Sequence, residues 1–485
     1  MIQIYVNEKN LEYDIYALFK AFFPQDEINI TVYEDNKEST GIPSFYDVVL
    51  SSSKVSCSFS DGDKEILEEE ELLSPGKEVK KSAMKRCIYK CIASHTGRSL
   101  PWGTLTGIRP AKIPMLMLTE GREDEEIKKY LRYKYLVSEE KIDLSMRIAH
   151  REREILKDID AKEGYSLYIG IPFCPTTCLY CSFTSYPIAK WQDRVDDYLK
   201  CVKKELDLVH ELYKGRAPDT VYIGGGTPTT LSPDQFKDLI GYLNKLFDLS
   251  SLLELTVEAG RPDSITRDKL ISLKGLGVSR ISINPQTMND ETLKVIGRRH
   301  TVDDIRNAFA LARECGFDNI NTDIILGLPG EGPDQVRHTM DELKKLDPDS
   351  ITVHSMAIKR AAGMAEYLKE HEELKSINTP DMLKCADEAA RSLGMEPYYM
   401  YRQKNMTGNF ENTGYSKPGC YGIYNILIME EVQSILAVGA GTVSKRVYED
   451  GLIERCDNVK DVSLYMERLD EMLERKRKLF GSLNT

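Results

Sequence analysis

The sequence predicts an α/β protein built on a partial (β/α)6 barrel, with a small α/β domain before it and a small C-terminal region after it. From Tyr165 onward, apolar strand segments alternate with helical segments, and the alternation fades beyond about residue 375. The six expected strands are SLYIGI, TVYIGG, LELTVEA, RISIN, NINTDIIL and SITVHSM. Each return crossover needs a helix, so this order favours parallel strands with function at their C-terminal ends. An open doubly wound sheet is the competing topology.

The chain should divide into a small α/β domain (1–97), a helical connector (98–160), the barrel (161–375) and a C-terminal α/β and helical region (376–485). In the first region we expect strands around one helix, a hairpin, and a helix over 76–97 that ends at Gly97, which suits a C-cap. Two charged helices, roughly 122–134 and 138–157, should follow a turn-rich stretch. No motif in residues 1–160 indicates a function.

Composition limits the class of protein. The 485 residues are 41% hydrophobic and 29% charged, as in ordinary globular proteins. A formal net charge of −12 disfavours a nucleic-acid binder, and no nucleic-acid partner is expected. No window reaches the ~18 apolar residues of a membrane span, and MIQIYVNEKN does not resemble a signal peptide, so we expect a cytoplasmic protein. The acidic run Glu68–Glu71 should be solvated surface.

Cysteine spacing gives the strongest functional signal. Eleven cysteines without an export signal argue against a disulfide framework. Cys174, Cys178 and Cys181 form the pattern C-x3-C-x2-C directly after the first barrel strand, in YIGIPFCPTTCLYCSF. A four-iron cluster needs four ligands, so three thiolates leave one iron open. The alternative is a partial zinc site completed by a distant residue, although zinc motifs more often come as paired C-x2-C units.

With this motif, the sequence resembles the radical S-adenosylmethionine (SAM) superfamily. Within it, the chain resembles the oxygen-independent coproporphyrinogen III dehydrogenases (oxidases), HemZ-type branch, over roughly residues 165–445. The resemblance implies a [4Fe-4S] cluster whose open iron chelates SAM, and cleavage of SAM to methionine and a 5′-deoxyadenosyl radical. It also implies anaerobic oxidative decarboxylation of coproporphyrinogen III to protoporphyrinogen IX in haem biosynthesis. The implied partners are this porphyrinogen and an electron donor such as flavodoxin or ferredoxin.

The family positions that contact SAM match this chain in order. Glycine after the second strand lets the backbone approach a ligand closely, Arg298 can hold a carboxylate with two hydrogen bonds, and Asp323 can accept hydrogen bonds from ribose. Each match alone is also typical of a turn, a surface carboxylate or core packing. The resemblance implies cofactor contacts at Tyr168, Tyr180, Gly225, Gly226, Thr227, Glu258, Gln286, Arg298, Asp323, Ala357 and Val443. We assign no catalytic side chain from the sequence.

Two departures from the family keep other functions open. Phe183 stands where the dehydrogenases carry a further cysteine, two positions after the third ligand. The related haem-chaperone branch has a His-Asn-x-x-Tyr-Trp motif, and the nearest stretch, Tyr424–Met429, lacks both its histidine and its tryptophan. A haem-binding chaperone on the same barrel is therefore one alternative. A radical enzyme for another substrate, such as RNA, is a second, which the acidic charge disfavours.

Several further side chains are weaker candidates. Cys87, Cys91 and His95 recur every four residues, so they share one face of a helix, which we interpret as a buried face rather than a metal site. His354 near the end of a strand could contact substrate or handle protons, or simply pack in the core. The propionates of the implied substrate call for cations, for which the candidates are Arg299, Lys359, Arg360, Arg402 and Lys404.

Overall fold

The computed structural model describes residues 1–33, 44–74, 76–107, 109–357, 362–371, 373–402 and 410–481. The chain forms two compact units, Met1–His150 with Arg402–Phe410, and Arg151–Tyr401 with Glu411–Thr485. The predicted boundaries at residues 97, 160 and 375 stay a prediction.

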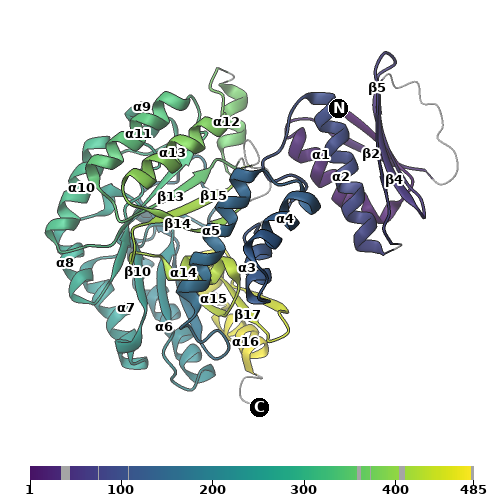
Figure 1. Ribbon diagram of the computed structural model, residues 1–485. Coiled ribbons are helices and arrows are strands. Elements are labelled where there is room, and N and C mark those ends of the chain that lie inside the picture. Colours follow the sequence, from purple (N-terminus) through teal and green to yellow (C-terminus); the bar gives the residue numbers. More distant parts are fainter. Residues whose placement is uncertain are drawn as a thin grey trace. The chain divides into compact units, whose positions relative to one another are not determined.

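The first unit is a five-stranded sheet with two helices on one face (Figure 1). Its strand order is β2-β1-β3-β4-β5, with β1 parallel to both neighbours and the later pairs antiparallel. The strands are β1 (Ile2–Val6), β2 (Ile28–Val32), β3 (Phe45–Leu50), β4 (Lys54–Ser60) and β5 (Glu65–Glu71), and the helices are α1 (Glu12–Phe22) and α2 (Lys77–Thr96). The expected C-cap is confirmed, because Gly97 has φ +65° and its amide donates to Ala93 O at 2.8 Å.

The acidic run differs from its prediction. It lies in edge strand β5, whose side chains alternate between exposed and half-buried positions. Half-buried Glu70 accepts a hydrogen bond from Arg86 Nε at 2.9 Å, whereas exposed Glu69 pairs with Lys54 at 2.8 Å. Only one face of the run is therefore solvated.

Three helices complete this part of the chain. The two charged helices are confirmed as α4 (Asp124–Tyr135) and α5 (Glu139–Leu156). The turn-rich stretch before them runs into an unpredicted helix, α3 (Lys112–Thr119). Pro114 lies in the first turn of α3, where proline replaces an amide that has no partner within the helix.

The second unit confirms the predicted fold class. Six parallel strands follow one another in chain order across an eleven-stranded sheet. In a doubly wound sheet, the order of the strands would instead reverse part-way across the sheet. They are β6 (Tyr165–Ile171), β9 (Thr220–Gly225), β10 (Glu254–Glu258), β11 (Arg280–Ser282), β12 (Ile320–Leu326) and β13 (Ser350–Ser355). Helices lie along the outside of this curved sheet (Figure 1) and bury their apolar faces against it. They are α6 (Val195–Leu212), α7 (Pro233–Leu246), α8 (Arg267–Gly275), α9 (Asp290–Val295), α10 (Val302–Glu314) and α11 (Pro333–Leu346).

The C-terminal segment adds strands to both edges of the barrel sheet. Beyond β13, β15 (Asn412–Ser416) and β14 (Glu396–Tyr401) continue the sheet with antiparallel pairing. At the opposite edge, β16 (Ser434–Val438) pairs parallel with β6, followed by antiparallel β17 (Val443–Val447) and β18 (Ile453–Asp457). Within the described residues, no pairing joins β14 to β18. The helices of this segment are α12 (Met364–Glu370), α13 (Pro380–Ser392), α14 (Ile423–Glu430), α15 (Val462–Glu467) and α16 (Leu469–Phe480).

A buried ion pair joins the last helix to the barrel. Glu205 on α6 and Lys476 on α16 are both 0% exposed, and their charged atoms lie 2.5 Å apart. Glu205 also accepts hydrogen bonds from Tyr465 Oη (2.5 Å), Asn458 Nδ2 (2.9 Å) and the Gly439 amide (2.6 Å). These bonds satisfy a carboxylate that would otherwise be costly to bury, and they fix the loop after β16.

None of the helices that the structure describes combines the length and apolarity needed to cross a membrane.

Candidate active site

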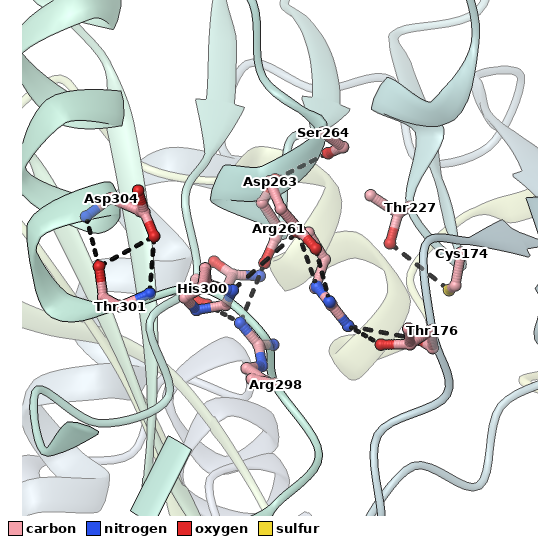
Figure 2. A network of polar contacts seen from close by, with 12 residues as sticks. Cys174, Thr176, Thr227, Arg261, Asp263, Ser264, Arg298, His300, Thr301 and Asp304 are labelled. Carbon is pink, nitrogen blue, oxygen red and sulfur yellow. Dashed lines mark hydrogen bonds and ion pairs between the residues drawn. The ribbon is translucent and has the colours of Figure 1, made fainter. Parts of the chain in front are cut away.

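The three motif cysteines lie on the loop that leaves β6. Cys174 ends the short strand β7 (Phe173–Cys174), which pairs with β8 (Tyr186–Pro187), and all three side chains are partly exposed. Burial raises the pKa of Cys174 to about 11; a hydrogen bond from Thr227 opposes this rise, while the nearby thiols of Cys181 and Cys178 add to it. The Thr227 hydroxyl donates to Cys174 Sγ at 3.4 Å (Figure 2). The fold thus brings the three thiols together beside the end of β9.

The glycines after β9 make room for this loop. Gly225 has φ +112°, a conformation that favours glycine. A Cβ on Gly226 would lie 2.7 Å from Phe173 O and 3.0 Å from Cys174 Sγ. A larger residue would therefore push the cysteine loop away from the ends of the barrel strands.

Arg261, which no sequence motif marks, points its guanidinium toward Thr176 on the cysteine loop (Figure 2). It is 3% exposed and follows β10, where Asp263 binds its guanidinium through two hydrogen bonds of 3.0 and 2.8 Å. Its Nη1 donates to the hydroxyl and carbonyl of Thr176 at 3.0 and 3.3 Å, and to Cys178 Sγ at 3.6 Å. A buried positive charge therefore touches one of the expected cluster ligands.

Glu258, at the end of β10, lies inside the barrel among polar partners. Its carboxylate accepts hydrogen bonds from Tyr222 Oη at 2.8 Å and from the Gly225 amide at 3.3 Å. Burial raises the pKa of Glu258 to about 7; the Tyr222 bond opposes the rise, and the charge of Asp323 adds to it. Glu258 is therefore poised between its charged and neutral forms near neutral pH.

Three stacked tyrosines form the wall next to Glu258. Tyr222 stacks on Tyr424 with a ring-centroid distance of 4.6 Å, and Tyr168 lies 6.0 Å from each of them. Tyr168 and Tyr222 come from neighbouring strands of the barrel, whereas Tyr424 comes from α14. Such a wall excludes water from the barrel interior and offers an aromatic face to a bound ligand.

A second polar chain lies at β12 and β13. Asp323 accepts a hydrogen bond from Asn321 Nδ2 at 2.8 Å and lies 3.7 Å from His354 Nε2. The other ring nitrogen of His354 is 3.2 Å from Tyr401 Oη on β14. Burial alone would raise the pKa of Asp323, but His354, together with hydrogen bonds from Asn321 and Thr352, holds it below its ordinary value. Asp323 is therefore kept as a carboxylate that can accept hydrogen bonds.

Arg298 and Gln286 lie between these groups. Arg298 is 6% exposed and donates to Tyr180 Oη (3.0 Å), Gly260 O (3.3 Å) and Asn284 O (2.5 Å), while its Nε is buried without a partner. Gln286 has φ +70°, which is unusual for a residue other than glycine and is typical of functional sites.

Two expected SAM contacts remain, Ala357 and Val443. Ala357 is half-buried directly after β13. Val443 begins β17 and is 39% exposed. It follows a loop that packs against the cysteine loop, since a Cβ on Gly441 would lie 2.8 Å from Thr184 Oγ1.

The helix face of Cys87, Cys91 and His95 packs within the first unit. Cys87 and Cys91 are confirmed as part of the core of the first unit, where Cys57 hydrogen-bonds Cys91. His95 stacks on Phe59 with the ring centroids 3.6 Å apart.

The cationic side chains expected to bind the propionates differ in their exposure. Arg402 is buried and donates to Leu105 O at 2.7 Å, so its guanidinium already has a structural role, whereas Arg299 is exposed. Lys359, Arg360 and Lys404 lie outside the described residues.

Comparison with known proteins places the chain in a family. The model of the radical SAM superfamily matches residues 168–343. The oxygen-independent coproporphyrinogen-III oxidase-like protein HemZ of Bacillus subtilis is 41% identical over 403 residues, which is 82% of this chain and 80% of that protein. The chain is a radical SAM protein of the HemZ family.

Two further relatives of this HemZ-family protein are informative. The heme chaperone HemW of Bacillus subtilis is 40% identical over 196 residues, 40% of this chain and 50% of HemW. The solved structure of the coproporphyrinogen III oxidase HemN of Escherichia coli, described as a radical SAM enzyme, has a TM-score of 0.52 at 22% identity and covers 66% of this chain and 73% of HemN. The latter likeness shows the fold alone.

As a radical SAM protein, the chain uses a [4Fe-4S] cluster and SAM, and the site fits these cofactors. The three thiols leave one iron of the cluster without a protein ligand. Gly226 leaves room for Cys174 Sγ, and the positive charge of Arg261 lies against Cys178 Sγ, where it would offset the negative charge of the thiolate. Among the described residues, no three His, Cys, Asp or Glu side chains surround a single point closely enough for one metal ion. This does not argue against a cluster, because each sulfur then binds a different iron atom and the three sulfurs need not converge on one point.

We expect Arg261→Gln to make the midpoint potential of the cluster more negative. The guanidinium stabilises the extra electron of the reduced cluster through its charge and its hydrogen bond to Cys178 Sγ. A tenfold weaker preference for the reduced state corresponds to about 59 mV, the order of shift expected in a redox titration followed by electron paramagnetic resonance. Arg261→Lys, which keeps the charge, should shift less. The exposed Arg267→Gln is the control, and equal potentials in Arg261→Gln and Arg267→Gln would exclude this role.

Proposed function

We propose that this protein is an enzyme that oxidatively decarboxylates coproporphyrinogen III to protoporphyrinogen IX without oxygen. One observation carries the proposal: the 41% identity to HemZ, named as oxidase-like, extends over 82% of the chain. The match to the chaperone HemW of Bacillus subtilis reaches a similar identity over 40% of the chain, and HemW of Escherichia coli is 27% identical over 62% of the chain. The likeness to HemZ thus extends over more of the chain than either of these two HemW matches.

In the proposed reaction, two propionate side chains become vinyl groups. When bound, the cluster and SAM supply the one-electron chemistry that removes a hydrogen atom from each propionate. The side chain then loses carbon dioxide and passes one further electron to an external one-electron acceptor, which leaves the carbon–carbon double bond. The protein must therefore hold the cofactors beside the substrate and keep water away from a reactive site.

The residues of the barrel interior suit these tasks. Glu258 in its ionised form can accept a hydrogen bond from a ligand amino group, and Arg298 retains an unpartnered buried N–H. His354, Asn321 and Thr352 together maintain Asp323 as a carboxylate acceptor. The wall of tyrosines beside Glu258 excludes water.

A haem chaperone is the second candidate, favoured by the 40% identity to HemW. The stretch that corresponds most nearly to the chaperone motif offers little to haem in this structure. Tyr424 belongs to helix α14, is buried, and stacks on Tyr222 inside the barrel. Phe183, at the position of the missing fourth cysteine, is 70% exposed, so its replacement of cysteine need not disturb the barrel interior.

Product analysis distinguishes the two functions. Anaerobic incubation with coproporphyrinogen III, SAM and a chemical reductant should yield two equivalents of carbon dioxide per porphyrinogen and stimulate formation of 5′-deoxyadenosine. The Cys178→Ala variant is the matched control and should yield neither. Stoichiometric haem binding together with unchanged coproporphyrinogen III after long incubation would favour the chaperone.

A further inference from the structure

A cavity of about 510 Å³ lies beside the cysteine loop. Thr176 and Thr177, two of the three residues between Cys174 and Cys178, line one side of it, and α9 with the segment that follows it lines the other. Figure 2 shows Thr176 on one side, with Arg298 and His300 across from it. The cavity therefore borders the loop that holds the cluster.

The lining of this cavity is positively charged on a chain whose net charge is −12. Lys294 and Arg299 are exposed at it, and the structure gives neither an ion-pair partner among the described residues. The carboxylate of the lining, Asp290, accepts a hydrogen bond from the Val302 amide at 2.9 Å. The two exposed cations are thus available to an anionic partner.

Buried donors at the same cavity also lack partners. Neither ring nitrogen of His300, which is 4% exposed, makes a hydrogen bond, and the nearest carboxylate oxygen, on Asp263, is 4.0 Å away. Arg298 Nε is likewise unsatisfied. These atoms have no exposed surface, so the charges available to a docked partner are those of Lys294 and Arg299.

This surface is connected directly to the cluster ligands. Thr176 accepts hydrogen bonds from Arg261 Nη1 through its hydroxyl and its carbonyl, and the same nitrogen donates to Cys178 Sγ. A partner bound over Thr176 and Thr177 would be separated from the cluster by little more than this loop. Of the expected SAM contacts, Arg298 borders this cavity, whereas Glu258 and Asp323 are not part of its lining.

We propose that this face, defined by Thr176, Thr177, Lys294 and Arg299, is the docking surface for the protein that reduces the cluster. The occupant is a small acidic one-electron carrier. An acidic carrier would be repelled by most of a chain with net charge −12, so a local positive surface beside the cluster selects both partner and orientation. The proposal rests on the radical chemistry of the proposed function but not on its substrate.

The test measures reduction of the cluster by stopped-flow absorbance in the full-length, cluster-loaded protein. The electron donor is fully reduced flavodoxin, and reduced methyl viologen, a small cation, serves as the chemical donor. The test variant is Lys294→Glu/Arg299→Glu. The matched control is Lys237→Glu/Lys245→Glu on α7, which changes the net charge equally at exposed positions outside the cavity lining.

Reduction of the wild type by flavodoxin should slow as salt is added, because salt screens the attraction between exposed charges. The test variant should be reduced about tenfold or more slowly at low salt and show little salt dependence, whereas the control should stay within about twofold of the wild type. Reduced methyl viologen should still reduce the cluster of the test variant at least as fast as that of the wild type, which shows that the cluster itself is intact.

Equal flavodoxin rates in the wild type and the test variant, or an equal loss in the control, would overturn the docking surface. Failure of the substrate assignment has a different signature. The cluster would then accept electrons through this face as expected, while coproporphyrinogen III stayed unchanged with either donor.

Discussion

Replacing Cys174, Cys178 or Cys181 by Ala should remove the cluster and with it all cleavage of SAM. Each thiolate would bind one iron, and the loop around them offers no spare cysteine, since the position two residues after Cys181 is Phe183. Anaerobic reconstitution of the wild type should give about four irons per chain and an absorbance band that oxygen bleaches. The three variants should lack this band.

Cys87→Ala is the matched control, because Cys87 is buried in the core of the first unit, far along the chain from the motif. It should reconstitute as the wild type does. Stoichiometric zinc and no iron in the reconstituted wild type would contradict the assignment, as would a full cluster in any of the three motif variants.

Loss of the Glu258 charge should have the next largest effect on the cleavage of SAM. Glu258→Gln keeps the shape of the side chain but removes a charged acceptor from a buried ligand site, a change typically worth a few kcal/mol and hence about a hundredfold in affinity. The variant should keep its cluster but form 5′-deoxyadenosine about a hundredfold more slowly at limiting SAM. Arg298→Ala and Asp323→Ala should behave similarly.

The pH dependence gives a sharper test of Glu258. Its pKa is raised to about 7, so the ionised fraction grows as pH rises through neutrality. If the carboxylate accepts a hydrogen bond from the amino group of SAM, wild-type affinity should rise about tenfold from about pH 6 to 8. The dependence should disappear in Glu258→Gln and persist in the control Tyr222→Phe, which removes one hydrogen bond to Glu258. Normal cleavage of SAM by Glu258→Gln, Arg298→Ala and Asp323→Ala would show that the ligand lies elsewhere.

The repeated strand–helix pattern was enough to predict the barrel, because each parallel strand is a short, nearly continuous apolar run between amphipathic helices. The strands added by the C-terminal segment could not be placed in this way. Their pairing with β6 and β13 depends on contacts between distant parts of the chain, which leave no local periodicity. Helix α3 begins inside the stretch that its prolines and glycines mark as turn-rich, so no local pattern separates it from the turns.

The expected site residues were found by resemblance, and the structure adds neighbours that no motif marked. Arg261 follows Glu258 by three positions, and only the fold shows that it turns back to Cys178. Tyr222 lies in the strand TVYIGG, where successive side chains point to alternate faces of the sheet. Its side chain therefore lies on the other face from those of its buried neighbours Val221 and Ile223. That alternation could have suggested an inward-facing tyrosine, but its bond to Glu258 requires the register between β9 and β10.

The pairing of β6 with β16 has a consequence for the order of events during synthesis. The strand that leads into the cysteine loop has β9 on one side, but its other neighbour is made only after almost the whole barrel has left the ribosome. Until then the apolar segment YSLYIGI presents an open edge, which is prone to pair with other chains. Contacts between such distant segments also form slowly. We therefore expect iron–sulfur loading to follow completion of the chain, and nascent or truncated chains that lack Ser434–Val438 to depend on chaperones.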